Sequence, residues 1–567
     1  MNLLKDFVDI DFDNTNYESV KSQFNIKIPE NFNFAYDVVD KYAELEPQKR
    51  ALVWCDDNGS SFEMTFLEMS EKSKMAANFL VNHGIKKGDH VLMILRRRWE
   101  FWPILLAMHR IGAVAIPATN QLLAKDIEYR LNAAKVNMVI CLDEKHIFDE
   151  INAVRPLTKT VDNFVIVRSI EAKTSAESEA DNLQTNGWIE FHGEFEKSSK
   201  EFARPTGEKA TQNSDAMLLY FTSGTSGQPK MVQHNFLYPL GHIITAKFWQ
   251  NVIDDGLHFS VAETGWAKAV WGKIYGQWIA GAAVFVYDMI QFKPGLLMKK
   301  IEEFKVNTFC APPTVYRYLI RSDLKKYDLS SLKYCVTAGE ALNSEVFNKF
   351  YEQTGIKMFE GYGQTESTLM AGNFPGMEPK PGSMGKAAPG YNLDVIDSNK
   401  NRCKPGDVGS IVLHLDAGKP TGLFIGYCGN DELTKEALSG DLYYTGDTGY
   451  FDEDGYIWFV GRNDDLIKSS GYRVSPFEVE SIFQQHPAVL ECAVTGIPDK
   501  HRGQAIKATI VLTKGYSPSK ELESEILQFV KSKTASYKHP RIIEFVKELP
   551  KTISGKIRRV EIRGEDK

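Results

Sequence analysis

Cysteine is scarce in this chain and is never closely paired. Seven cysteines are spread over 567 residues, and no two of them stand at the Cys-x-x-Cys spacing. Structural zinc sites need clustered thiolates and small secreted folds need paired ones. The pattern therefore excludes a zinc cluster and a disulfide framework, and it is typical of a reducing compartment. The cysteines are Cys55, Cys141, Cys310, Cys335, Cys403, Cys428 and Cys492.

Long apolar runs are missing as well. The longest, "WIAGAAVFVY" at residues 278–287, is far too short to span a bilayer. The first residues, "MNLLKDFVDIDFDN", are acidic and lack the apolar segment of a secretory signal, so we expect neither a signal peptide nor a transit peptide. We predict a cytoplasmic protein without integral membrane association.

A strong net charge is lacking too. Lysine and arginine together number 67 and aspartate and glutamate 74, which gives a formal net charge of −7 at pH 7. Such a balance exerts no general attraction on nucleic acids or anionic membranes, so we expect no nucleic-acid partner, and any anion site must be local. A chain of 567 residues is too long for one core, so at least two domains are expected.

Strands and helices alternate through most of the chain. From about residue 62 to 287, and again from 307 to 369, apolar runs such as "HVLMIL", "NTFCAPP" and "YCVTAGE" lead into loops or amphipathic segments. This rhythm predicts parallel β-α-β units, whose loops at the carboxyl ends of the strands meet in one crevice. From residue 391 the pattern changes to short strands and turns, and after residue 462 a new unit begins. We expect an α/β protein with domains at 1–463 and 464–567.

One loop has the composition of a phosphate site. "YFTSGTSGQPKMV", residues 220–232, follows an apolar run at 216–221 that we interpret as a buried strand. It is not a Walker A loop, because Pro229 precedes Lys230 and Met231 follows it. Glycines let backbone N–H groups turn inward, hydroxyls donate and the lysine adds positive charge, so we predict polyphosphate binding rather than a Ser/Gly surface turn. The expected ligands are Thr222, Ser223, Gly224, Thr225, Ser226, Gly227, Gln228 and Lys230.

Five segments in a fixed order resemble one enzyme superfamily. They are this loop, "EGYGQTE" at residues 360–366, "YYTGDTGY" at 443–450, "GRNDDLIKSSGYRVSPFEVE" at 461–480 and "KTISGKIRR" at 551–559. Together they resemble the adenylate-forming superfamily, which includes acyl-CoA synthetases, luciferases and the adenylation domains of peptide synthetases. Within it, "TGWA" at 264–267, "APPTVYR" at 311–317 and "SGYRVSPFEVE" at 470–480 are most similar to medium-chain acyl-CoA synthetases.

The resemblance implies a fold and a reaction. The fold is a large N-terminal domain of doubly wound parallel sheets with a small distorted β-barrel, followed by a small mobile α+β domain. In the reaction, a small-molecule carboxylic acid attacks the α-phosphate of Mg-ATP to give acyl-adenylate and pyrophosphate, and the thiol of coenzyme A then displaces AMP. ATP, Mg²⁺ and coenzyme A are the expected cofactors. Because a carboxylate must approach the negatively charged α-phosphate of ATP, the site needs cations and hydrogen-bond donors around the phosphates.

The resemblance also implies roles for residues of the ATP site. Thr365 would donate to the α-phosphate, Glu366 would bind Mg²⁺ through a hard oxygen, and Lys556 would neutralise charge developing at the α-phosphate. Asp447 would accept the ribose hydroxyls, unless it is merely an Asx-turn residue, and Arg462 would contact the ribose from the domain boundary. The remaining members of the expected nucleotide site are Gly339, Glu340, Glu360, Gly361, Tyr362, Gly363 and Gln364.

The C-terminal residues are assigned by the same resemblance to coenzyme A and to a domain rotation. Asp464 is the expected hinge, Gly471 would leave room for pantetheine unless it is a simple hairpin glycine, and Arg473 would approach the phosphate of AMP. Basic side chains would bind the phosphates of coenzyme A, although each could also be a solvated surface charge. The expected contacts are Ser470, Gly471, Tyr472, Arg502, Lys531, Lys533, Lys538 and Arg541.

An acyl pocket is expected around one glycine. Acetate-specific members of the superfamily carry tryptophan at the position of Gly363, so glycine predicts a pocket open to longer chains and a short-to-medium or branched-chain acid. Lys268 interrupts an apolar segment: facing solvent it would have no role, and inside the pocket it would need an anionic or hydrogen-bonding partner. Glu263 stands where similar enzymes usually have Asp. The expected lining is Trp266, Lys268, Thr337, Gly339, Gly363 and Thr365.

Other activities share parts of this pattern. A stand-alone adenylating enzyme would pass an acyl or aminoacyl group to another thiol acceptor, and a luciferase-like oxygenase would carry the same ATP motifs. A carrier domain with its serine motif does not follow "KTISGKIRR", which disfavours a peptide-synthetase type. A non-catalytic nucleotide-binding protein is disfavoured because Lys556, Glu366 and Asp447 are all present. The pattern leaves the acid, the oligomeric state and the regulation open.

Overall fold

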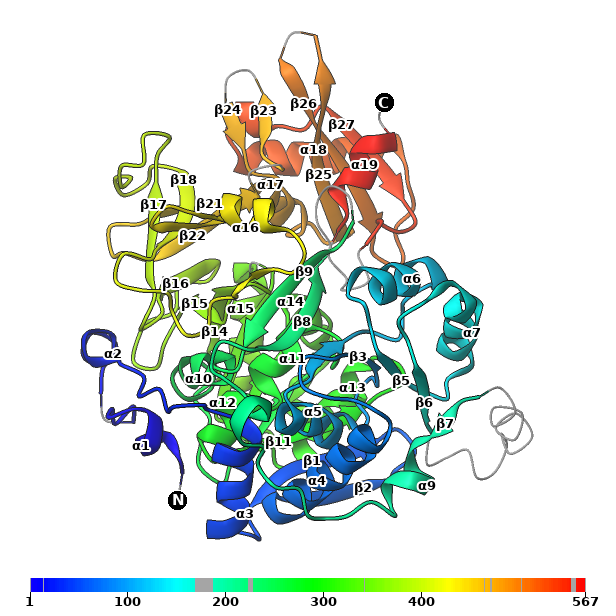
Figure 1. Cartoon of the computed structure of the whole chain (residues 1–567). Helices are drawn as coiled ribbons and strands as arrows, with labels where there is room; N and C mark the ends of the chain where they lie inside the picture. The colour runs from blue at the N-terminus through cyan, green and yellow to red at the C-terminus, as the bar shows by residue number, and fades with distance from the viewer. Residues whose placement is uncertain are drawn as a thin grey trace.

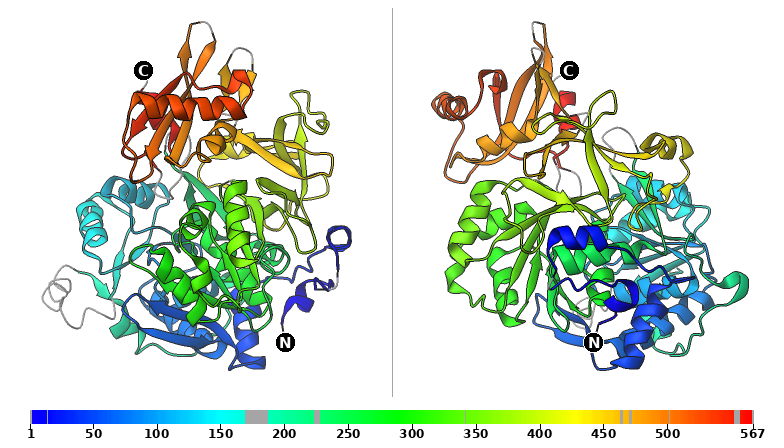
Figure 2. Two further views of the ribbon diagram at one scale, coloured as in Figure 1. Left: turned by 180° about the vertical axis from the view of Figure 1, so that it is seen from behind. Right: turned by 90° about the vertical axis from the view of Figure 1, so that its left-hand side faces the viewer.

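Three sheets organise the described part of the chain. The computed structural model describes residues 2–13, 15–168, 187–222, 228–340, 342–462, 465–469, 472–500, 502–551 and 557–565. Its strands form sheets of eight, fourteen and five strands. The third sheet and its helices, orange to red, lie at the top of Figure 1, above the two larger sheets. Both views of Figure 2 show the same separation of this unit from the body.

The eight-stranded sheet has a parallel centre and an antiparallel edge. Strand β8 pairs in parallel with β4, and the run continues in parallel to β7, whereas β9 pairs antiparallel with β8 and β19 antiparallel with β9. In spatial order the strands are β19 (Gly426–Tyr427), β9 (Lys230–Asn235), β8 (Ala216–Thr222), β4 (Val114–Pro117), β3 (His90–Ile94), β5 (Met138–Leu142), β6 (Asn163–Val167) and β7 (Ile189–Glu190).

The fourteen-stranded sheet changes from parallel to antiparallel pairing at β14. Its strands from β1 to β14 pair in parallel through β11, β10, β12 and β13, and beyond β14 the pairing is antiparallel. In spatial order the strands are β17 (Asn392–Ile396), β18 (Gly409–His414), β21 (Leu442–Phe451), β22 (Ile457–Arg462), β16 (Ser383–Ala387), β15 (Leu369–Gly372), β14 (Met358–Gly363), β13 (Tyr334–Ala338), β12 (Thr308–Cys310), β10 (Leu257–Ser260), β11 (Ala283–Asp288), β1 (Arg50–Asp56) and β2 (Ser61–Thr65), with β20 (Leu438–Ser439) beside β21.

The third sheet belongs to the C-terminal segment. A long antiparallel pair, β25 and β26, forms its centre, and β27 adds to β26 in parallel. Its strands are β24 (Tyr472–Val474), β23 (Ile467–Ser469), β26 (Gly503–Leu512), β25 (Val489–Asp499) and β27 (Ile542–Val546), and its helices are α17 (Pro476–Phe483), α18 (Lys520–Lys533) and α19 (Arg559–Glu565). Buried aliphatic side chains between this sheet and α17 and α18 form a separate core.

Helices cover the two large sheets. They are α1 (Leu4–Phe7), α2 (Tyr17–Gln23), α3 (Lys41–Leu45), α4 (Phe66–Asn82), α5 (Phe101–Ile111), α6 (Ala124–Ala133), α7 (Lys145–Val154), α9 (Phe191–Phe195), α10 (Tyr238–Ile243), α11 (Ala267–Gly272), α12 (Tyr275–Ile279), α13 (Pro294–Glu303), α14 (Pro313–Leu319), α15 (Ser344–Thr354) and α16 (Asp431–Ala437). Among the described residues there are also two π-helical segments, Ala35–Asp40 and Ile244–Trp249, and short 3₁₀ segments at Arg155–Leu157, Gly207–Lys209, Leu324–Lys326 and Ser536–Lys538.

Local sequence explains where the central helix pair begins and ends. The hydroxyl of Thr65 accepts from the backbone N of Glu68 at 3.2 Å, and the Glu68 carboxylate accepts from the backbone N of Thr65 at 2.8 Å. This capping box satisfies amides at the start of α4. Helix α5 ends at Gly112, whose φ of +87° is the left-handed conformation that glycine adopts without strain.

The predicted α/β fold class is confirmed, with one refinement. The sheets are mixed, and the antiparallel part is continuous with the parallel part through the β14–β15 pair. Asp464, the predicted boundary and hinge, lies outside the described residues, so the division at 463 and 464 stays a prediction. Within the described ranges, no helix is long and apolar enough to cross a bilayer.

Candidate active site

The hairpin of β8 and β9 carries the predicted phosphate loop. Thr222, the last residue of β8, pairs with Lys230, the first residue of β9, so the chain leaves and re-enters the sheet at one point. The strand before the loop is buried at Met217–Tyr220, as predicted, and Gln228 is exposed. The loop residues Ser223, Gly224, Thr225, Ser226 and Gly227 lie outside the described residues.

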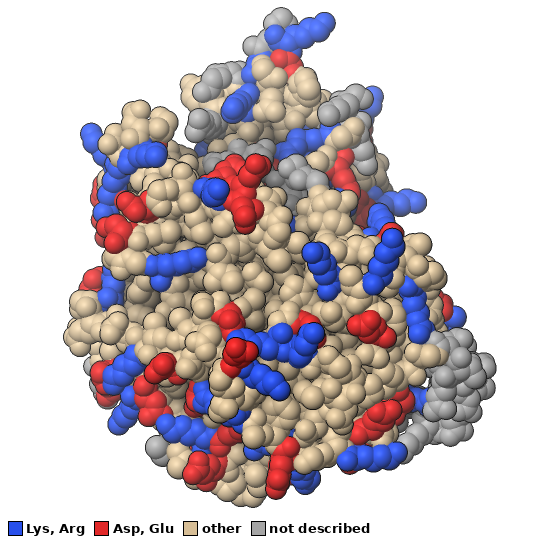
Figure 3. Space-filling model, viewed as in Figure 1, with Lys and Arg blue, Asp and Glu red and all other residues tan. Residues whose placement is uncertain are grey.

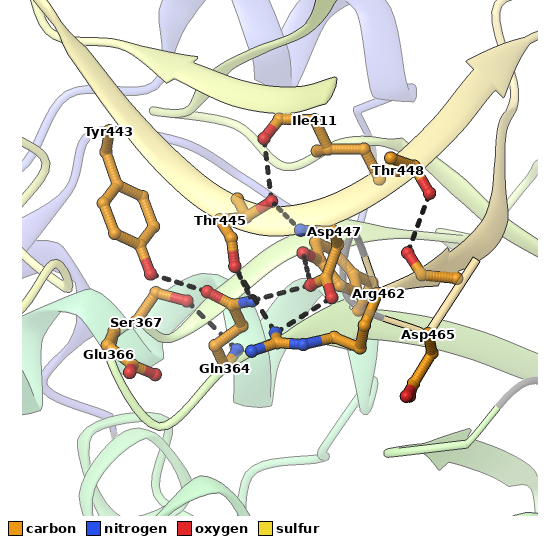
Figure 4. Close-up of polar contacts among 12 residues, drawn as sticks. Gln364, Glu366, Ser367, Ile411, Tyr443, Thr445, Asp447, Thr448, Arg462 and Asp465 are labelled. Carbon is orange, nitrogen blue, oxygen red and sulfur yellow. Dashed lines mark hydrogen bonds and ion pairs between the residues drawn. The ribbon is translucent and has the colours of Figure 1, made fainter. Parts of the chain in front are cut away.

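Gln364, the first residue after β14, is held by β21 (Figure 4). Its Nε2 donates to the carbonyl oxygen of Thr445 at 2.8 Å and to Oδ2 of Asp447 at 2.6 Å. Its Oε1 accepts from the hydroxyl of Tyr443 at 2.6 Å. The predicted nucleotide residue Gln364 therefore uses its side chain to fix the loop against β21.

The next two residues are held by other parts of the chain. The carbonyl oxygen of Thr365 lies 2.8 Å from Nε2 of His234 on β9. The carbonyl oxygen of Glu366 accepts from the backbone N of Phe424 at 2.7 Å. Each residue of the 364–366 loop is thus attached to a different neighbouring segment.

Asp447 receives hydrogen bonds from three side chains. Its Oδ2 accepts from the hydroxyl of Tyr362 at 2.5 Å and from Gln364, and its Oδ1 accepts from Nη1 of Arg462 at 3.0 Å. The register of β21 and β22 places Asp447 directly opposite Arg462. Asp447 is 4% exposed and lies within a strand, which excludes the alternative of a simple turn residue. Burial raises the pKa of Tyr362 well above its ordinary value, so its hydroxyl remains a donor.

Glu366 and Lys230, predicted to serve magnesium and the phosphates, both contact Tyr427 of β19. The Tyr427 hydroxyl donates to Oε1 of Glu366 at 2.9 Å, and Nζ of Lys230 lies 5.3 Å from the centre of the Tyr427 ring. The structure therefore brings together two residues that are far apart in the sequence. Among the described residues, no group of three or more His, Cys, Asp or Glu side chains could hold a metal ion. A single carboxylate fits Mg²⁺ that is bound mainly by water and nucleotide phosphates.

Glu340 and Glu360 have buried or paired carboxyl groups. Glu340 accepts from the hydroxyl of Thr314 at 2.9 Å and from Arg317 at 3.0 Å, which ties it to α14. Glu360 is 3% exposed, and its carboxyl accepts from the backbone N of Leu342 at 3.2 Å. Burial raises the pKa of Glu360 well above its ordinary value. The Glu360 side chain thus holds the loop after β13, and its place in the nucleotide site stays a prediction.

Lys268 points into the site. It lies on α11, and its Nζ donates to the carbonyl oxygen of Ala338 at 3.1 Å. Gly339, with a φ of +99°, lies under this ammonium group: a Cβ added there would be 1.6 Å from Lys268 Nζ. Lys268 is half-buried and has a backbone carbonyl as partner, which is the kind of partner expected for a lysine inside the pocket. Its role in the acyl pocket stays a prediction.

The space beside Gly363 is filled by a tryptophan from another element. A Cβ added at Gly363 would lie 2.3 Å from Cη2 of Trp271 and 2.5 Å from the carbonyl oxygen of Thr368. The indole of Trp271, from α11, thus lies beside the hydrogen of Gly363. The expectation that this hydrogen leaves the pocket open to longer chains stays a prediction. Trp271 is 6% exposed and packs against Trp249 and His242. Gly361 likewise has no space for a side chain, since an added Cβ would lie 2.5 Å from the ring of Trp249.

The loop that carries Trp266 is fixed by Glu263. The carboxylate of Glu263 accepts from the backbone N of Gly265 at 3.0 Å and from the hydroxyl of Thr264 at 3.4 Å. Burial raises the pKa of Glu263, while Arg97 nearby lowers it. Trp266 is half-buried at the start of α11, and Thr337, also predicted for the pocket, is fully buried on β13.

The predicted coenzyme A contacts are brought together in part. Tyr472 is half-exposed and stacks on Tyr537 with ring centres 4.4 Å apart, next to Lys538, which is paired with Glu478. Lys533 donates to Gln485 at 2.9 Å. Arg502 is half-buried, whereas Lys531 and Arg541 are exposed and separate from the stacked tyrosines in the chain. On the face drawn in Figure 3, basic and acidic side chains are interspersed.

Several predicted residues cannot be placed. Lys556, Asp464, Ser470 and Gly471 lie outside the described residues, and so does the side chain of Arg473, whose backbone belongs to β24. Their roles stay predictions.

Trp271 and His234 are the site residues that the sequence analysis missed. A signal for Trp271 was present, because Lys268 and Trp271 are three positions apart and share one face of a helix. No comparable signal pointed to His234, whose partner Thr365 lies in the loop between β14 and β15 of the other large sheet.

Comparison with known proteins agrees with this arrangement. Residues 39–427 match the family described as AMP-binding enzyme, and residues 478–556 match the AMP-binding enzyme C-terminal domain. This chain belongs to the AMP-binding enzyme family. The family membership confirms the resemblance to adenylate-forming enzymes.

Two human relatives and two solved structures illustrate the similarity. Acyl-coenzyme A synthetase ACSM3, mitochondrial, from Homo sapiens is 40% identical over 561 residues, which is 97% of this chain and 92% of the relative. Acyl-coenzyme A synthetase ACSM4, mitochondrial, from Homo sapiens is 40% identical over 552 residues, covering 96% and 92%. The anthranilate CoA ligase AuaEII in complex with anthranoyl-AMP has a TM-score of 0.84 at 29% identity over 95% of this chain and 98% of that one. The acyl-CoA synthetase of Brucella canis has a TM-score of 0.73 at 28% identity over 97% and 99%.

The names of the two human relatives include the word mitochondrial. They therefore give no support to the cytoplasmic location predicted from the sequence.

Replacing Asp447 tests the ribose assignment. In Asp447→Asn the amide nitrogen must face at least one of the donors from Tyr362, Gln364 and Arg462, and the charge opposite Arg462 is lost. We expect kcat/KM for ATP to fall about 30-fold or more, since removing one partner of a buried, hydrogen-bonded charge pair is costly. Asp394→Asn is a control, because Asp394 is also largely buried and paired with an arginine on the same sheet. Equal losses in both variants contradict the assignment.

Replacing Trp271 tests whether its ring borders the acyl pocket. Trp271→Leu removes the ring beside Gly363, so kcat/KM should rise about 10-fold or more for longer acids relative to shorter ones. Trp278→Leu makes the same exchange at a fully buried tryptophan on α12. We expect both to lose about 2–4 kcal/mol of stability, with the preference among acids changing only in Trp271→Leu. An unchanged preference places the acyl chain elsewhere.

Proposed function

We propose that this protein is an ATP-dependent acyl-CoA synthetase that activates a small carboxylic acid as acyl-AMP and transfers the acyl group to coenzyme A. The observation that carries the proposal is the convergence on the 364–366 loop of the phosphate hairpin at Lys230 and the paired Asp447 and Arg462. The relatives named acyl-coenzyme A synthetase match nearly the whole chain at 40% identity.

The roles of the residues follow from their positions. Attack of a carboxylate on the α-phosphate increases negative charge where Lys230, Thr365 and Lys556 are expected to act, and fixed cations and donors stabilise that charge. Asp447 and Arg462 hold the ribose, so the α-phosphate lies at a defined distance from the acid. Glu366 would hold Mg²⁺ through its carboxylate, and the ion would neutralise charge on the departing pyrophosphate. Coenzyme A would enter along the C-terminal segment beside Tyr472.

The acid is proposed to be short-to-medium or branched. Trp271 occupies the space beside Gly363 and limits the length of the acyl chain on that side. Lys268 places an ammonium group above Gly339, so part of the pocket wall is polar. The cytoplasmic location and the mobility of the C-terminal domain stay predictions.

A second function, transfer to another thiol acceptor, differs in its final step alone. The solved anthranilate CoA ligase holds anthranoyl-AMP, an acyl adenylate, and such an intermediate would serve both functions. The acceptor is what separates them.

A panel of acids tests the proposal. We expect ATP–pyrophosphate exchange with short-to-medium or branched carboxylic acids, and stoichiometric thioester when coenzyme A is present. Exchange with an acid but no thioester under any condition would favour the second function. No exchange with any acid would contradict both.

Two variants separate the half-reactions. Lys556→Ala should lower adenylation about 100-fold or more, because it removes a cation from the developing charge, and should spare thioester formation from supplied acyl-adenylate. Gly471→Leu should spare adenylation and block the thiol. Gly515→Leu, in a turn of the same C-terminal segment with a φ of +101°, controls for a general effect of leucine at glycine. Loss of both half-reactions to the same extent in Lys556→Ala contradicts the assignment of separate roles.

A further inference from the structure

His234 is a fully buried imidazole attached to the loop at the α-phosphate. It lies on β9, is 0% exposed, and its Nε2 is 2.8 Å from the carbonyl oxygen of Thr365. Carbonyl oxygens only accept, so the proton of this hydrogen bond resides on Nε2. Nδ1 has no hydrogen-bond partner among the described residues, so the imidazole is held to the site through one hydrogen bond.

The surroundings keep this imidazole neutral and oriented. Burial lowers the pKa of His234 to about 3, even though the bond to Thr365 raises it, so a neutral N–H donates at physiological pH. The ring stacks on Tyr238 of α10 with centres 3.8 Å apart, and Tyr238 in turn packs edge-on against His242 at 4.7 Å. A ring fixed in this way has little freedom to turn away from Thr365.

The strand that carries His234 also carries the phosphate lysine. Lys230 and His234 are four positions apart on β9, so their side chains point to the same face of the strand. Four residues of strand span about 13 Å, which fixes the separation between the lysine and the point where the 364–366 loop is held. A shift of β9 therefore moves both groups together.

We propose that His234 is a positioning residue for adenylation, holding Thr365 at the place where it donates to the α-phosphate. This inference depends on the proposed function, because it assumes that Thr365 acts on the α-phosphate. His234 does not touch substrate: it acts through the backbone of Thr365, and it joins the placement of Thr365 to that of Lys230.

Two replacements of His234 test this role. His234→Leu has similar bulk and no donor, whereas His234→Gln keeps an N–H donor on a flexible side chain. We expect kcat for ATP–pyrophosphate exchange to fall about 10- to 100-fold in His234→Leu, since small displacements of positioning groups have effects of this size. KM for ATP should stay within about three-fold, and His234→Gln should recover most of the rate. If His234→Leu does not fold, His234→Phe, which retains a ring to stack on Tyr238, replaces it.

A double-variant cycle separates positioning from general support of the fold. If His234 acts through Thr365, then Thr365→Val combined with His234→Leu should be no slower than Thr365→Val alone. Tyr238→Phe, which keeps the stacked ring, serves as the packing control and should leave the rate within about two-fold. Multiplied losses in the double variant, equal losses in His234→Leu and His234→Gln, or an unchanged rate in His234→Leu would overturn the proposal. The wild-type exchange rate is the baseline, so failure of the proposed function is seen separately as its absence.

Discussion

The attachment of three consecutive residues to three different segments is the constraint on which the site depends. Gln364 is bonded to β21, Thr365 to β9 and Glu366 to the chain before β19. Strand β21 belongs to the fourteen-stranded sheet, and β9 and β19 belong to the eight-stranded sheet. The loop is therefore the place where the two large sheets are joined by hydrogen bonds at the site. Groups assigned to phosphate and ribose keep their spacing because the two sheets keep theirs.

The C-terminal segment is tied together by ion pairs of its own. Arg559 of α19 donates to Glu480 of α17 at 2.7 Å, and Arg563 donates to Asp465 at 2.9 Å. The last helix is thereby bound to the start of the segment, next to the predicted hinge at Asp464. Such cross-links allow a small domain to rotate as a unit while the flexible change is confined to one position. They would keep the segment folded during the predicted rotation.

The sequence predicted the parts of the site that are encoded within short segments. The buried strand before the phosphate loop follows from an apolar run, and the position of Asp447 and Arg462 follows from motifs of known order. What could not be predicted were contacts between residues that are distant in the chain. Trp271 and Gly363 meet because the ring of Trp271 on α11 reaches the end of β14. The ring fits there because Gly363 has no side chain, and neither segment shows this fit by itself.

The same reasoning explains why the surroundings of two charged residues were not predicted. The sequence left the place of Lys268 open between solvent and pocket, because most lysines face solvent. Its partner is the backbone carbonyl oxygen of Ala338. Every residue has such a carbonyl group, so the sequence could not indicate this contact. Glu360 was assigned to the nucleotide by its motif, whereas its burial and its bond to Leu342 depend on the loop after β13. Motifs identify which residues belong to a site, and tertiary packing decides which of them face the ligand.

The position of Gly339 restricts how the acyl pocket can change during evolution. Its left-handed backbone disfavours any other residue, and the ammonium of Lys268 occupies the volume that a side chain would need. A substitution at 339 therefore meets backbone strain whatever surrounds it, and in addition the flexible end of the Lys268 side chain would have to move aside. Shortening the side chain at position 268 vacates this space and also removes the hydrogen bond to the carbonyl oxygen of Ala338. Replacing the lysine removes the steric obstacle at position 339 but not the backbone strain, so the glycine is the more tightly constrained of the two positions.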